Sequence, residues 1–225
     1  MIVRIKRQEE RGSVPYWQSF IYDGPKNVTV SAVLEALNYT DDLYDAEGKP
    51  ASRIRWECSC MQIVCGGCAM VINGVPALAC GTFVDKVKGD ELLLEPLSKF
   101  PVIADLVVDR SIIYENLNQA QAYLEEHAVY DSKQYAHQYS VAKCLKCGLC
   151  LEVCPNYRSG GKFFGPVFAN ESYLLTSQTK TEGKRLTGQY KEHFQQWCSK
   201  ALSCQTVCPA GIETLTSIFR MNRKR

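Results

Sequence analysis

Cysteine is the residue type that most constrains this chain, because its twelve copies lie in three short groups rather than being spread over the 225 residues. The groups span residues 58–80, 144–154 and 198–208. Thiols so close in sequence converge on a metal group or pair as disulfides, and either arrangement ties the backbone around them. We therefore expect the fold to be organised around three cysteine-lined sites.

The second group follows the pattern C-x2-C-x2-C-x3-C-P of bacterial ferredoxins, which hold iron-sulfur clusters. It consists of Cys144, Cys147, Cys150, Cys154 and Pro155. The third group fits the same pattern if Ala201 takes the place of the second cysteine. Its members are Cys198, Cys204, Cys208 and Pro209. The third group therefore lacks one iron ligand.

In two-cluster ferredoxins the last cysteine of each motif binds the cluster of the other motif, so the ligand sets cross. A full set, suited to a [4Fe-4S] cube, then consists of Cys144, Cys147, Cys150 and Cys208. A three-thiolate set, for which a [3Fe-4S] cluster is expected, consists of Cys154, Cys198 and Cys204. A fourth iron held by water or by a non-cysteine side chain remains the alternative at the second site.

The first group has the spacing C-x4-C-x2-C-x11-C, and its first three cysteines match the plant-type [2Fe-2S] pattern. Its members are Cys60, Cys65, Cys68 and Cys80. Gly66 and Gly67 are expected to take positive φ and to bring backbone N–H groups close to the cluster sulfurs. A hairpin turning at Asn73-Gly74 leads to the last ligand. The remaining Cys58 is predicted to be a small buried residue or a free thiol, rather than a spare ligand.

Two other uses of cysteine are weaker interpretations. Disulfides would require an oxidising compartment, and the first ten residues are charged and lack the apolar stretch of a signal peptide. Zinc binds four-cysteine sites, but zinc sites do not need the C-P ending or the x4, x2 loop.

The net charge of +2 argues against a nucleic-acid partner, and no apolar run approaches the roughly 20 residues that span a bilayer.

The elements predicted from hydrophobic patterning form two domains. Residues 2–5 and 16–22 resemble strands, and Val30 to Leu37 fits a helix capped by Thr29. Beyond residues 100–101 the apolar residues recur at near-helical intervals, beginning at Val107. The fold class is therefore α+β. Residues 1–104 are expected to form a β-grasp plant-type [2Fe-2S] ferredoxin domain, and residues 105–225 an all-α bacterial-ferredoxin-like domain.

With these motifs in this order, the chain resembles the iron-sulfur subunit of succinate dehydrogenase and fumarate reductase over nearly its whole length. The matching stretches are residues 65–70, 73–80 and 100–109. The resemblance implies an electron-transfer subunit that passes electrons between the FAD of a flavoprotein subunit and a quinone at a membrane anchor. It also implies a peripheral position on the cytoplasmic face of the bacterial inner membrane. The chain has no G-x-G-x-x-G fingerprint after a strand, so the flavin belongs to the partner.

Departures from the family pattern concern the quinone. Ubiquinone-linked members typically carry tryptophan and histidine where this chain has Ser159 and Ser199, so the resemblance favours fumarate reductases and menaquinone. It also places Pro155, Ser199 and Arg220 in the quinone vicinity. The family has a lysine at the position of Asn222, and here Arg220 or Arg223 would supply that positive charge. The basic C-terminal residues are expected either to face anionic lipid headgroups or to be solvated; they are Arg220, Arg223, Lys224 and Arg225.

Two other functions stay open on the sequence alone. The first is a related subunit that wires a flavoprotein to another substrate or to a thiol partner. Such thiol-linked relatives usually continue into a cysteine-rich domain, whereas the sequence after Cys208 holds no further cysteine. The second is a free-standing ferredoxin-like carrier, which would be stable in isolation.

Overall fold

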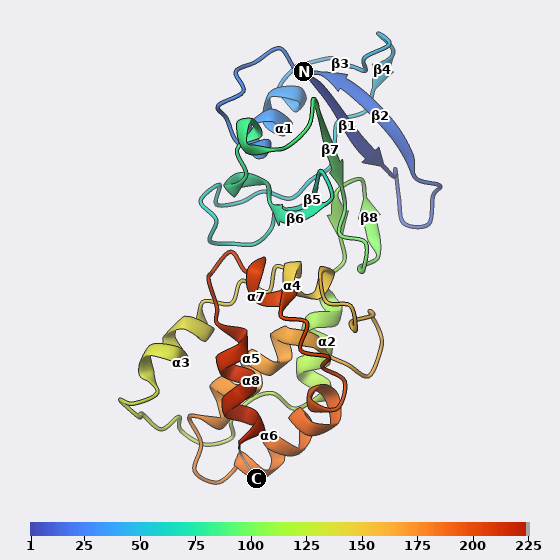
Figure 1. The fold of residues 1–225 in the computed structure, drawn as a ribbon. Coiled ribbons are helices and arrows are strands. Elements are labelled where there is room, and N and C mark those ends of the chain that lie inside the picture. Colours follow the sequence, from blue (N-terminus) through green and yellow to red (C-terminus); the bar gives the residue numbers. More distant parts are fainter. Residues whose placement is uncertain (224–225) are drawn as a thin grey trace. The chain divides into compact units, whose positions relative to one another are not determined.

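The computed structural model describes residues 1–223 of the chain, which divides into two compact units, Met1–Asp109 and Arg110–Arg225 (Figure 1). The last two residues, Lys224 and Arg225, which were predicted either to face lipid headgroups or to be solvated, lie outside the described residues. Each unit contains its own buried core. The cysteine groups divide between the units, one in the first and two in the second.

The first unit is built on a mixed five-stranded sheet with the order β2-β1-β7-β5-β6. Only β1 and β7 pair in parallel, and the other neighbours are antiparallel. Val3 and Ile5 alternate with half-buried residues along β1 and are fully buried, as expected for a strand with one face on the core. The strands are β1 Ile2–Arg7, β2 Tyr16–Ile21, β5 Ala69–Ile72, β6 Val75–Leu78 and β7 Glu91–Glu95.

Helix α1, Val30–Asn38, supplies much of the remaining core of this unit. Its residues Val30, Val33 and Leu34 are fully buried. The Thr29 hydroxyl accepts a hydrogen bond from the Ala32 N–H, which satisfies one of the free donors at the helix start. The predicted helix and its cap are both confirmed.

The first unit ends in a small hairpin formed by β8, Val102–Ala104, and β9, Val107–Val108. Val107, where the helical pattern was predicted to begin, is therefore in a strand, and that prediction is wrong. The reason is the turn at Asp105, whose φ of 45° is left-handed and returns the chain along β8. The compact units divide after Asp109, whereas a division after residue 104 would cut this hairpin. The other short elements of the unit are β3 Leu43–Tyr44, β4 Pro50–Ala51 and the 3-10 helices Ala79–Gly81 and Val84–Lys86.

In the second unit, every regular element among residues 110–223 is a helix. Helix α5, Gly165–Thr176, is the most buried of them and packs against helices on several sides. Its Ala169 and Tyr173 have no exposed surface. The other helices are α2 Ser111–Gln119, α3 Tyr135–Ala142, α4 Leu149–Glu152, α6 Gly183–Tyr190, the π-helix Lys191–Gln195, α7 Ser203–Thr206 and α8 Thr214–Asn222.

Candidate iron-sulfur sites

The first cysteine group lies in an irregular loop between β4 and β5 and in the 3-10 helix that follows β6. The β5–β6 hairpin turns at Asn73 and Gly74, which have φ values of 45° and 78°, as the Asn-Gly pair predicted. This hairpin brings the last cysteine of the group back to the loop. The sulfurs of Cys68 and Cys80 are 3.4 Å apart, although the two residues are separated by the whole hairpin.

Backbone N–H groups point at the sulfurs of this site. Gln62 donates to Cys60 at 3.3 Å, and Gly67 donates to Cys65 at 3.4 Å. The Ile63 N–H donates to the sulfur of Cys80 at 3.3 Å, and the Cys80 N–H donates to the sulfur of Cys68 at 3.4 Å. Such donors favour thiolates, which are the form that ligates iron.

The thiols of this site differ in acidity for identifiable reasons. Backbone N–H groups of Gln62 and Val64 lower the pKa of Cys60 to about 7. Burial raises the pKa of Cys68 to about 12. The Cys60 thiol, in the loop, therefore loses its proton more easily than the buried Cys68 thiol. A bound iron ion would stabilise the thiolate form of Cys68.

One prediction for this loop needs correction. Gly66 has a φ of 76°, as predicted, but Gly67 does not have a positive φ; the other left-handed residues of the loop are Met61 and Ile63.

Cys58 was predicted to be a small buried residue or a free thiol, and it is an exposed free thiol. Burial first, and then Glu35 and the cysteines of the group, raise the pKa of Cys58.

The second and third cysteine groups have the same backbone course. Lys146 and Gly148 take φ values of 52° and 89° before helix α4, and Lys200 and Leu202 take 58° and 60° before helix α7. The residue between each pair is Cys147 in one motif and Ala201 in the other. The two motifs therefore repeat residue by residue, and alanine stands at the structural position of a ligand.

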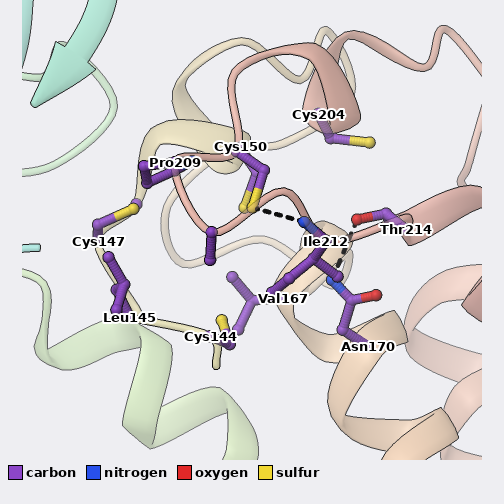
Figure 2. A pocket seen from close by; sticks show the side chains of 13 residues that line it. Cys144, Leu145, Cys147, Cys150, Val167, Asn170, Cys204, Pro209, Ile212 and Thr214 are labelled. Carbon is purple, nitrogen blue, oxygen red and sulfur yellow. Dashed lines mark hydrogen bonds between the residues drawn. The ribbon is translucent and has the colours of Figure 1, made fainter. Parts of the chain in front are cut away.

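The sulfurs of the second unit gather in two groups that do not follow sequence order. A cavity is lined by the first three cysteines of the second motif together with Cys208 and Cys204 of the third. In Figure 2 the sulfurs of Cys144 and Cys147 point into this space, whereas the sulfur of Cys204 points away from it. The Ile212 N–H donates to Cys208 at 3.4 Å.

The mutual influence of the thiols agrees with this grouping for Cys147 and Cys204, whereas Cys204 contributes more than Cys208 to the raised pKa of Cys150. Burial first, and then the neighbouring sulfurs of Cys144 and Cys208, raise the pKa of Cys147 to about 11. Burial first, and then Cys154 and Cys198, raise the pKa of Cys204 to about 11. Cys208 thus lies with the second motif and Cys154 with the third. Both sets consist of soft sulfur donors, and the cavity of the first set is also lined by apolar side chains such as Leu145, Val167 and Ile212. These properties fit iron-sulfur clusters.

Residues with a predicted quinone role lie at two places. Ser199 donates to the side chain of Asn156 at 3.0 Å, and Asn156 directly follows the exposed Pro155. Arg220 instead stacks over Tyr173 and donates to its hydroxyl at 2.8 Å. Among the described residues no hydrogen bond or ion pair joins Arg220 to Pro155 or Ser199.

Comparison with known proteins agrees with both domains. The family described as "2Fe-2S iron-sulfur cluster binding domain" matches residues 2–115, and the family described as "4Fe-4S dicluster domain" matches residues 140–212. The succinate dehydrogenase iron-sulfur subunit of Bacillus subtilis is 31% identical over 230 residues, covering 97% of this chain and 90% of that protein. The fumarate reductase iron-sulfur subunit of Escherichia coli O6:H1 is 30% identical over 210 residues, with coverages of 89% and 83%.

The chain belongs to the family of succinate dehydrogenase and fumarate reductase iron-sulfur subunits. It contains a [2Fe-2S] binding domain followed by a [4Fe-4S] binding domain. A chain of the Mycobacterium smegmatis Sdh1 complex in the apo form has the same fold, with a TM-score of 0.78 at 23% identity over 99% of this chain and 94% of that chain. Within residues 1–223, no helix of this family member has the length and apolar character needed to cross a bilayer.

The sequence prediction missed charged residues around the cavity of this family member. Lys146 forms an ion pair of 2.7 Å with Glu171 of α5, and Arg110 donates to the carbonyl of Cys147 at 3.3 Å. Lys146 had a signal in the sequence, since lysine occupies the same place in both motifs. Arg110 and Glu171 had none, because Arg110 directly precedes α2 and Glu171 lies in α5, and only the tertiary fold brings these residues to the second motif.

Proposed function

We propose that this chain is the electron-transfer subunit of a membrane-bound fumarate reductase or succinate dehydrogenase complex. The observation that carries the proposal is the crossed grouping of sulfurs in the second unit. Three sulfurs of one motif meet the last sulfur of the other, which is the ligand arrangement of a two-cluster ferredoxin.

The proposal assigns each sulfur set to one cluster. The [2Fe-2S] site is formed by Cys60, Cys65, Cys68 and Cys80. The [4Fe-4S] site is formed by Cys144, Cys147, Cys150 and Cys208. The [3Fe-4S] site is formed by Cys154, Cys198 and Cys204. Ala201 stands where the missing cysteine of the last motif would be. This supports a cluster of three irons, since no thiolate is available for a fourth iron.

In this assignment the first unit is a β-grasp ferredoxin domain of the plant type, and the second is an all-α domain of the bacterial ferredoxin type. The mixed sheet with one packed helix supports the first statement. The repeated motifs around α4 and α7 support the second. We place the domain boundary at the end of the β8–β9 hairpin.

The partners follow from the relatives. Subunits of this kind work with a flavoprotein that carries FAD and with membrane-anchor subunits that bind quinone, and we assign both partners to this chain. The chain then lies peripherally on the cytoplasmic face of the bacterial inner membrane. Ser199 in place of histidine favours menaquinone. We assign the quinone vicinity to the corner of the proposed three-iron site formed by Pro155 and Ser199, a choice supported by the hydrogen bond between Ser199 and Asn156; Arg220, bound to Tyr173, is the weaker candidate.

Rapid mixing of the membrane-bound complex tests the function. Succinate added anaerobically should reduce the clusters, and a menaquinone analogue should reoxidise them faster than a ubiquinone analogue. Clusters that respond to dithionite but neither to succinate nor, after reduction, to fumarate would overturn the assignment to this enzyme class. Faster reoxidation by the ubiquinone analogue would overturn only the choice of quinone.

A further inference from the structure

Lys146 lies in the segment that carries two of the cysteines lining the cavity, Cys144 and Cys147. It has a left-handed φ of 52°. Lysine has no preference for this conformation, which glycine and asparagine adopt more easily. A cationic residue is therefore not required by the backbone at this position.

The side chain of Lys146 is held in one place. Its Nζ lies 2.7 Å from Oε2 of Glu171, and the two side chains are only 18% and 19% exposed. Glu171 belongs to α5, the central helix of the unit, and α5 contacts α4, the short helix that carries Cys150. The ammonium is thus fixed beside the cavity rather than extended into solvent.

Positive charge is fixed at the ligand segment itself. Lys146 directly precedes Cys147 and follows Cys144 by two residues, whereas Glu171 reaches its ammonium from α5. The guanidinium of Arg110 adds a second positive charge at the same segment, since it donates to the Cys147 carbonyl at 3.3 Å.

The third motif provides an internal comparison. Lys200 occupies the same motif position with nearly the same φ of 58°, and its N–H donates to Cys198 at 3.4 Å. Its side chain is exposed, and within residues 1–223 it forms no ion pair. Of these two lysines, only Lys146 is therefore half-buried and paired with a carboxylate.

We propose that Lys146, positioned by Glu171, raises the reduction potential of the [4Fe-4S] site relative to that of the same site without this charge. This inference rests on the proposed function, because it needs a cube on the Cys144 set. Reduction of the cube adds one electron and hence one negative charge, with no bond formed or broken. A fixed cation nearby stabilises the added charge, and its effect is larger where water is scarce.

The test is an anaerobic redox titration of the purified complex, with the EPR signal of the reduced [4Fe-4S] cluster as the readout. Lys146→Met should move the midpoint potential to more negative values, because it removes the cation and leaves Glu171 unpaired. Lys146→Arg should keep the potential near that of the native protein. The double variant Lys146→Met with Glu171→Met should lie between the native protein and the single Lys146→Met variant.

The double variant also guards against loss of folding, since replacing both members of a buried ion pair by apolar residues is often tolerated. Arg185→Met is the matched control. Arg185 forms a comparably buried pair with Glu182, 28% and 12% exposed, but contacts the segment 121–123 instead of the cavity. It should leave the midpoint potential unchanged.

The outcomes separate this inference from the proposed function. A normal [4Fe-4S] signal with the same midpoint in the native, Lys146→Met and double variants would overturn the role of Lys146 alone. A shift in Arg185→Met as large as that in Lys146→Met would also overturn it, since the effect would then not be local. Absence of any [4Fe-4S] signal in the native complex would overturn the cluster assignment and this inference together.

Discussion

At the scale of single residues, Ala201 leaves the proposed last site with three thiolates, those of Cys154, Cys198 and Cys204. It occupies the place of Cys147 in a motif whose backbone follows the other motif through the same pair of left-handed residues. A methyl group at that place offers iron no ligand. The side chain, rather than the backbone, therefore limits the site to three thiolates.

Ala201→Cys should accordingly convert the three-iron site into a four-iron cube and lower its potential, because a fourth thiolate adds negative charge. EPR of the oxidised variant is the measurement, and the [3Fe-4S] signal should be lost. Its retention at native intensity would contradict the ligand assignment.

A second residue-scale feature is the buried ion pair of Arg7 and Asp105. Their charged groups are 2.9 Å apart, and each side chain is only 2% exposed. The carboxylate also accepts the N–H groups of Gln8 and Arg55. The pair thereby joins β1 to the segment that leads into the [2Fe-2S] loop.

Arg7→Met should lower the free energy of unfolding of the first unit by about 3–5 kcal/mol, because it leaves a buried carboxylate without its cation. Arg11→Met, at the more exposed pair with Asp109, should cost about 0–1 kcal/mol. Urea unfolding followed by tryptophan fluorescence measures both. Equal effects of the two variants would show that burial of the pair is unimportant.

At the scale of elements, the β5–β6 hairpin is anchored by its own turn residue. The Asn73 amide donates to the carbonyls of Lys88 and Glu91 at 2.9 and 2.8 Å, and its oxygen accepts from the Leu93 N–H at 2.7 Å. The turn is thereby fixed to β7 and its preceding loop. This contact sets the position of the hairpin that carries Cys80.

Asn73→Ala should destabilise the first unit by about 2 kcal/mol, since it removes these hydrogen bonds and a residue suited to positive φ. The same urea unfolding experiment checks it. Asn118→Ala, at an exposed position of α2, is the control and should change stability little. An Asn73→Ala variant as stable as that control would show that β7 does not depend on the turn.

The elements that the sequence predicted are those with local causes. The Asn-Gly turn, the Thr29 cap and the α1 core face each depend on residues within a few positions of one another. The β8–β9 hairpin was missed because its turn depends on Asp105, whose conformation is stabilised by contacts with β1 and residue 55. The exposure of Cys58 and the Lys146–Glu171 pair were also unpredictable from local patterns, since both depend on how distant segments meet.

At the scale of the whole molecule, the chain combines two cluster-binding units that fold around thiols from different parts of the sequence. Metal-thiolate bonds are part of the folding free energy of such units. The three sulfur sets differ in number, burial and nearby charge, and these are the properties that tune cluster potentials. Three different redox stations in one chain are therefore a direct consequence of where the cysteines lie.

The most direct test of this account is low-temperature EPR of the anaerobically purified native complex, oxidised and then reduced with dithionite, with iron and acid-labile sulfide quantified. The account predicts a [3Fe-4S] signal when oxidised, [2Fe-2S] and [4Fe-4S] signals when reduced, and about nine irons per chain. Two cubes with no three-iron signal would contradict it, because a group other than cysteine would then complete the site at Ala201.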